Sequence, residues 1–201
     1  MTLSRTAVFL LLASCASAPQ PRTAAVPENL RVPDGQTVLL HVAAKGAQVY
    51  TCKAKAAEPA AYEWVLKAPE AELFDERGAK IGRHYAGPTW ESADGSRVVG
   101  EVMERSPVQG AVPLLLLRAK SNEGAGALES VKYIQRLDTA SGVAPAAGCD
   151  AEHAGTEARV EYSATYDFYG PKGQGADAAS PRTPADPKPR SASERPRWSR
   201  S

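Results

Sequence analysis

The sequence predicts an all-β fold, a single antiparallel β-sandwich or barrel-like domain, and three observations support this prediction. Apolar and polar residues alternate without a fault from Ala158 to Phe168, as in a strand with one buried face. Other short segments rich in strand-forming residues are separated by turns that contain Gly or Asp. The chain has neither a long amphipathic helical pattern nor an alternation of strands with helices, which argues against a parallel α/β fold.

The remaining elements follow from the same patterns. Alternation recurs at 97–103 and at 131–137, where Val131, Tyr133 and Leu137 share one face. The apolar run Leu114–Leu117 predicts a central strand covered on both faces. One short helical segment is expected at most, over Pro69–Leu73. We also expect strands at 36–42, 48–52, 62–66, 72–74, 114–120 and 158–168, with turns at 33–36, 45–46, 76–78 and 93–96.

The beginning of the chain has the pattern of a secretory signal that ends in a lipid attachment site. Arg5 supplies a positive charge, residues 7–12 are apolar, and Cys15 follows directly behind Ala13-Ser14. The alternative is ordinary secretion with cleavage after Ala18. Pro19 disfavours that cleavage, because proline has no N–H and a fixed φ. The apolar run is too short for a spanning helix, which needs about 20 residues.

These features divide the chain into a signal peptide (1–14), a lipidated tether (15–27), a β-rich domain (28–170) and a disordered basic tail (171–201). Residues 6–170 carry 16 Lys and Arg against 20 Asp and Glu, whereas the tail carries 7 against 3. The tail could contact anionic lipids or cell-wall polymers, or it could be a solubilising segment without a partner. Nucleic-acid binding is disfavoured, because the folded part is mildly acidic.

The residue behind Cys15 bears on localisation. It is Ala16 rather than Asp, and by resemblance to lipoproteins of Gram-negative type this implies the outer membrane, with the domain facing the periplasm. That implication assumes a host with two membranes. The alternative location is a secreted or soluble periplasmic protein.

The chain has three cysteines, and an odd number in an exported protein needs an explanation. A lipid on Cys15 leaves Cys52 and Cys149, which could form one disulfide in an oxidising compartment. The alternative is two buried free thiols. A metal site is not expected, because the histidines His41 and His153 lie apart from each other and lack ligand spacing.

The densest group of chemically active side chains lies between Gly82 and Asp94. A general acid/base site would use His84 with Glu91 or Asp94, since a neighbouring carboxylate orients an imidazole and raises its basicity. In the alternative, Asp94 makes a hairpin turn and His84 bonds to a loop. No nucleophile accompanies the group, and the fingerprint of a dinucleotide cofactor is absent, so no cofactor is expected.

Ligand or glycan binding would need an exposed aromatic platform with polar neighbours. Trp64, Tyr85 and Trp90 are candidates for such a platform, although tryptophans in a domain of this size often belong to the core. Gln135 shares the face of Tyr133 and Leu137, so its amide could be turned inward, where it would need hydrogen-bond partners. The candidate ligand-binding residues are therefore Trp64, Tyr85, Trp90, Gln135 and the neighbouring Arg136.

Eight motifs follow one another in a fixed order along the chain: Gly46–Cys52, Pro69–Leu73, His84–Glu91, Asp94–Ser96, Leu115–Leu117, Tyr133–Arg136, Gly148–Asp150 and Tyr162–Tyr169. Together they resemble the family known as domain of unknown function 3455, found in bacteria and fungi. The resemblance covers about Pro27–Tyr169. It implies no established activity and no catalytic residue, and it agrees with pairing Cys52 to Cys149. Some fungal members carry a malate-dehydrogenase-like label, which this sequence does not support.

The sequence therefore favours a lipid-anchored protein of the cell envelope. Its β-rich domain would bind a ligand, an envelope polymer or a protein partner, or have a structural role, without catalysis. One alternative is an exported hydrolase or lyase that uses His84 with Glu91 or Asp94. A further alternative is a glycan-binding module that uses Trp64 or Trp90.

Overall fold

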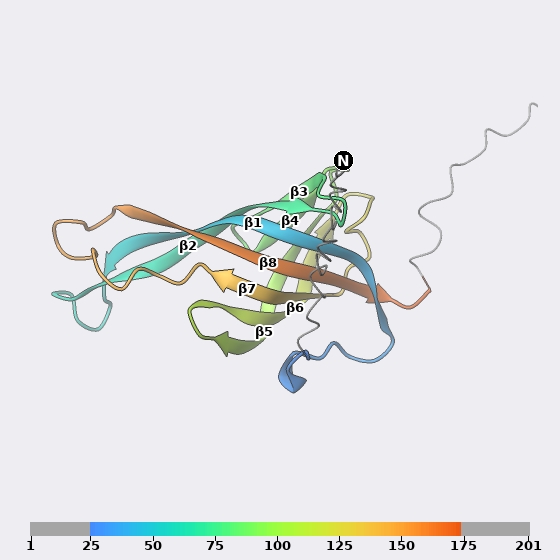
Figure 1. Cartoon of the computed structure of the whole chain (residues 1–201), viewed down its shortest axis with the longest axis horizontal. Helices are drawn as coiled ribbons and strands as arrows, with labels where there is room; N and C mark the ends of the chain where they lie inside the picture. The colour runs from blue at the N-terminus through green and yellow to red at the C-terminus, as the bar shows by residue number, and fades with distance from the viewer. Residues whose placement is uncertain (1–24, 174–201) are drawn as a thin grey trace, which may run out of the picture.

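The computed structural model describes residues 25–173, which form a closed barrel of antiparallel strands in the order β1 to β8 (Figure 1). Each strand pairs with the next, and β8 returns to pair with β1. The predicted all-β antiparallel fold is confirmed. The elements are η1 (a 3₁₀ helix, Glu28–Leu30), β1 (Gln36–Ala54), β2 (Tyr62–Phe74), β3 (Lys80–Tyr85), β4 (Thr89–Ser92), β5 (Arg97–Val108), β6 (Ala111–Glu123), β7 (Tyr133–Ser141) and β8 (Glu157–Pro171).

The first two strands are longer than the sequence patterns predict. The turn expected at 45–46 is wrong, because both residues lie inside β1, and the short helix expected over Pro69–Leu73 is wrong, because that segment belongs to β2. Gly46 is required for a different reason: a Cβ there would lie 2.1 Å from the carbonyl oxygen of Glu70 and 2.5 Å from Cα of Ala71. Its glycine therefore permits two strands to approach closely.

Strands β1, β2 and β8 extend together beyond the barrel and form an arm, at the left in Figure 1. The segment between β7 and β8 returns along this arm. A disulfide joins Cys52 of β1 to Cys149 of that segment, with the two Cα atoms 5.3 Å apart, which confirms the predicted pairing. The indole Nε1 of Trp64 donates to the carbonyl of Ala147 at 3.0 Å, so the segment is held to β2 as well.

The barrel interior is filled mainly by large side chains. Trp90 contacts Tyr166 and Phe168 edge-on, with ring centroids 5.3 and 5.9 Å apart. Gly100 lies beneath the indole, where a Cβ would come within 2.9 Å of Trp90. Leu117 is fully buried in the same cluster. An eight-stranded barrel has an interior of about this capacity, so side chains can fill it.

The N-terminal segment covers part of the outer surface. Leu30 of η1 is fully buried, and Leu115, Leu116 and Leu117 of β6 are buried one after another. Because neighbouring residues of a strand point to opposite faces, both faces of β6 are covered there, as the apolar run predicts. No helix within 25–173 is long and apolar enough to cross a membrane.

The close approach at Gly46 gives a stability prediction. Gly46→Ala places a methyl group where β2 backbone atoms lie, so we expect the free energy of unfolding to fall by about 1–3 kcal/mol, as for overpacked sites. Urea unfolding followed by far-UV circular dichroism measures the change. The control is Lys45→Ala at an exposed neighbour, with an expected change within about 0.5 kcal/mol. Equal stability of the two variants would contradict the packing argument.

Candidate functional site

His84 lies inside the barrel rather than at its surface. Its side chain is 2% exposed and stacks on Trp90, with centroids 4.3 Å apart and planes at 9°. Nδ1 lies 2.8 Å from the carbonyl oxygen of Thr89, and donation to this acceptor requires the proton on Nδ1. Burial lowers the pKa of His84 to about 3 although the Thr89 bond opposes the shift, so the ring is neutral at pH 7. His84 is therefore a satisfied core residue.

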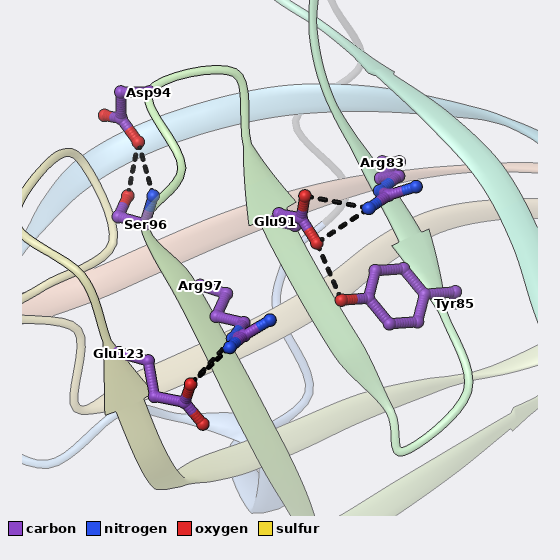
Figure 2. Close-up of polar contacts among 7 residues, drawn as sticks. All are labelled: Arg83, Tyr85, Glu91, Asp94, Ser96, Arg97 and Glu123. Carbon is purple, nitrogen blue, oxygen red and sulfur yellow. Dashed lines mark hydrogen bonds and ion pairs between the residues drawn. The ribbon is translucent and has the colours of Figure 1, made fainter.

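Glu91 lies on the outside of the barrel, where two residues of β3 reach it from the neighbouring strand (Figure 2). The Tyr85 hydroxyl donates to Oε2 at 2.8 Å, and Arg83 Nη2 donates to both carboxylate oxygens at 2.9 and 3.0 Å. These hydrogen bonds, from Tyr85 first and then Arg83, lower the pKa of Glu91. The bond to Glu91 in turn raises the pKa of the Tyr85 hydroxyl. The carboxylate is thus held ionised, as a structural acceptor.

Asp94 is turned away from Glu91 and organises two loops (Figure 2). Its carboxylate accepts from the backbone N–H and the hydroxyl of Ser96 at 2.9 and 2.6 Å, and from the N–H of Ala127 at 2.8 Å. Burial opposes ionisation, but these bonds outweigh it and lower the pKa of Asp94. The structure therefore does not bring His84, Glu91 and Asp94 together: one faces the core, one the outer surface and one a turn.

A groove of about 680 Å³ crosses the outer surface beside Tyr85. Its charged side chains are mostly paired: Arg83 with Glu91, Arg159 with Glu70, and Arg97 with Glu123 beyond the rim. Of the lysines and arginines that line the groove, Lys45 alone has no carboxylate partner among the described residues. A charged ligand in this groove would have to displace existing pairs.

Gln135 is buried, but it faces outward rather than into the barrel. It pairs in register with Leu116 under η1, while the neighbouring Ile134 belongs to the interior. Its Nε2 donates to the carbonyl of Leu30 at 2.5 Å, and its Oε1 accepts from the hydroxyl of Tyr169 at 2.7 Å. The expectation that this amide is buried and needs hydrogen-bond partners agrees with the structure, but the amide is buried beneath η1 and not inside the barrel. Gln135 instead fastens the N-terminal segment to the outer wall.

Arg136 follows on the opposite face, so its side chain points into the barrel, facing Tyr166 of β8. It is 9% exposed. Of the two predicted binding residues, Gln135 thus lies on the outer wall of the barrel and Arg136 lies inside it.

The two candidate platform tryptophans differ in exposure. Trp90 is 1% exposed and belongs to the core. Trp64 is half-buried on the arm, where it lines a pocket of about 300 Å³ together with Tyr62, Lys55 and Glu63. Of the two, only Trp64 offers an accessible aromatic face beside polar side chains.

One group of residues at the outer surface escaped the sequence interpretation. His41 Nδ1 hydrogen-bonds to Asp167, its direct neighbour across the β1–β8 ladder. Both line an apolar pocket of about 380 Å³ walled by Leu114 and Leu137. Asp138, which adopts φ 47°, accepts from the hydroxyl of Thr165 at 2.9 Å at the same pocket. These partners are far apart in sequence, so only the strand register could have revealed them.

No group of three or more His, Cys, Asp or Glu side chains in residues 25–173 could hold a metal ion. A family model described as a protein of unknown function (DUF3455) matches residues 33–170, which confirms the resemblance found in the sequence motifs. Neither curated proteins nor solved structures give a match.

Burial of His84 gives a pH prediction. The folded pKa of about 3 lies below the ordinary value of 6.5, so between these values the unfolded chain binds a proton that the folded chain does not. Keeping His84 neutral in the folded protein therefore costs no stability above pH 6.5, and the free energy of unfolding falls as the pH drops from 6.5 towards 3. From pH 7 to 5 we expect the wild type to lose about 2 kcal/mol more unfolding free energy than His84→Gln.

Urea unfolding at the two pH values measures this difference. His153→Gln is the control, because that imidazole is exposed and bonded to Asp150 at the surface. It should not remove the destabilisation that His84 causes. An unchanged pH dependence in His84→Gln would show that His84 protonates freely in the folded protein.

Proposed function

The chain belongs to the DUF3455 family of proteins of unknown function, and for this member we propose an exported, lipid-anchored role in the cell envelope. In this proposal Cys15 carries the lipid, and the β-barrel is a binding or structural module rather than a catalyst. The anchor would hold it at the outer membrane, facing the periplasm.

The observation that carries the proposal is the disulfide between Cys52 and Cys149. A disulfide of this kind fits an oxidising compartment such as the periplasm. It uses two of the three cysteines and leaves Cys15, which lies outside the described residues, directly behind the apolar run of the signal pattern. Exported location and an available cysteine are the two conditions that lipid attachment at Cys15 requires.

The arrangement of the candidate residues supports a binding module over an enzyme. His84 has a backbone carbonyl as its hydrogen-bond partner and is shut in the core, while Glu91 is engaged by Tyr85 and Arg83. A general acid/base pair needs both groups within reach of one substrate. The large interior side chains leave recognition of any sizeable partner to the outer surface.

Acylation at Cys15 can be tested directly. In a Gram-negative host grown with radiolabelled palmitate, we expect the full chain to take up label and to sediment with outer membranes, whereas Cys15→Ser takes up none. Cys52→Ala is the matched control and should keep the label, because it alters a different cysteine. An unacylated mature N-terminus at Pro19 would instead establish ordinary secretion and refute the anchor.

A second candidate role, glycan binding, is favoured by the position of Trp64. Its Nε1 is fixed on Ala147, and its ring lines the pocket that Tyr62, Lys55 and Glu63 also border. Aromatic faces with adjacent polar groups suit sugar rings, which combine apolar C–H faces with hydroxyls. An envelope polymer would be within reach of a tethered barrel.

Sedimentation with purified peptidoglycan sacculi tests this role. We expect Trp64→Ala to weaken binding about tenfold, the equivalent of about 1.4 kcal/mol. Leu66→Ala removes another exposed apolar side chain from the same strand and should bind like the wild type. If the wild type does not sediment with sacculi, or if both variants bind equally, glycan recognition through Trp64 is excluded.

A further inference from the structure

Arg136 is a buried cation without a carboxylate partner in the described part of the chain. Its Nε and Nη2 both donate to the carbonyl oxygen of Pro113, at 3.0 and 2.8 Å. Nη1 takes no part in either bond. A neutral carbonyl orients a guanidinium but does not compensate its charge, and burying an uncompensated charge costs several kcal/mol.

Two tyrosine hydroxyls lie near this charge. Tyr166 faces Arg136 directly across the β7–β8 ladder, and Tyr162 lies on the same face of β8. Both hydroxyls are fully shielded from solvent, and neither makes a hydrogen bond of normal geometry within residues 25–173. The nearest polar groups are the two hydroxyls themselves and, for Tyr166, the guanidinium of Arg136, and hydrogen bonding among them contributes to the pKa shifts of both tyrosines. Burial raises the pKa of both tyrosines, and the charge of Arg136 opposes this rise in each. The charge of the guanidinium thus acts on both hydroxyls.

Gln48 adds a further unused donor on the adjacent strand. Its side chain is 1% exposed, and its Nε2 has no partner among the described residues. Gly142 lies against both Gln48 and Tyr162: a Cβ at this glycine would be 3.2 Å from Gln48 Cγ and 2.6 Å from Tyr162 Cβ. Gln48 and Tyr162 therefore border the same end of the interior.

The strands beneath these groups carry small residues. Between Tyr162 and Tyr166 on the inner face lies Ala164, which pairs with Ala44, and Tyr162 itself pairs with Gly46. The ring of Trp90 packs against that of Tyr166, and Phe168 and Leu117 belong to the same cluster. Because large rings pack against this region, any ligand beside the hydroxyls must be small.

We propose that Arg136, Tyr162 and Tyr166 bind one small monovalent anion inside the barrel, of halide or formate size, with Gln48 as a further donor. The guanidinium and the amide Nε2 can only donate, and the two phenols can donate as well. An anion accepts hydrogen bonds from all of them and compensates the charge of Arg136. A water molecule could bond to the same groups, because the phenol oxygens also accept hydrogen bonds, but it would leave the charge of Arg136 unpaired.

An ion could reach this site from an outer groove that Tyr162 borders. This groove has a volume of about 810 Å³ and is also lined by Ala140 and Ser141 at the end of β7. Tyr162 would thus lie between the proposed anion site and this groove. Local opening there would admit a small ion without unfolding the barrel.

Thermal unfolding of the full chain in sodium bromide and in sodium formate tests the proposal, with sodium gluconate keeping the ionic strength constant. We expect a saturable rise in Tm, of the order of 5 °C at saturation, for bromide and formate but not for gluconate, which is too large for the site. Tyr162→Phe and Tyr166→Phe keep the rings and lose one donor each. Each should raise the apparent Kd for bromide about tenfold, and Arg136→Gln should abolish the response.

Arg159→Gln is the matched control, since it removes an exposed arginine that pairs with Glu70 on the outer surface, and it should respond to bromide like the wild type. If Arg136→Gln does not fold, the two phenylalanine variants decide the matter. The proposal is overturned if bromide acts no differently from gluconate, or if the tyrosine variants respond like the wild type. A bromide-soaked crystal without anomalous signal beside Arg136 would overturn it too.

Discussion

The pairing of β1 with β8 closes the barrel and decides which side chains face inward. Along this ladder Val42 lies opposite Tyr166, and Gly46 opposite Tyr162, on the inner face. Side chains alternate with a period of two, so a slip of one residue would move every one of them to the outer surface. The close contact of Gly46 with β2 restricts the same register from the other side. The chemistry of the interior therefore depends on this one strand being held in place by both neighbours.

The alternation of apolar and polar residues predicted strands correctly, whereas a glycine and a proline led to wrong predictions of where strands end. The pattern from Ala158 to Phe168 is continuous and lies within β8, as predicted. Gly46 and Pro69 suggested a turn and a helix start, yet both lie inside long strands. Gly46 is needed for strand proximity, and Pro69 lies beside a register shift between β1 and β2, where a missing N–H is tolerated. Neither reason is visible in local sequence, because each depends on a strand distant along the chain.

The candidate site shows the same limit. The sequence correctly placed Tyr133, Gln135 and Leu137 on one face, but that face is the outer one. Ile134 and Arg136 point inward. The alternation of side chains along a strand could not show which face is the inner one, because both faces of β7 are buried here. The 3₁₀ helix η1 covers Gln135 on the outer face, and the barrel interior covers its neighbours on the inner face. In the same way, the sequence suggested His84 and Glu91 as an acid/base pair. In the β3–β4 hairpin, however, Glu91 lies opposite Arg83, the neighbour of His84, so the two side chains point to opposite faces of the sheet.

The charges of this protein fall into two groups with different consequences. Those on the outer wall, such as Arg159 with Glu70 and Arg83 with Glu91, form exposed cross-strand pairs. Such pairs contribute about 0–1 kcal/mol each, since water screens them well. Arg136 is in a less polar environment, where the same charge has a stronger field and stays uncompensated by any described carboxylate. The exposed pairs neutralise one another and leave the outer groove with little net attraction for an ion. The electrostatic force available for selecting a small ligand is therefore strongest inside the barrel, at a buried cation that no carboxylate of the described residues pairs with.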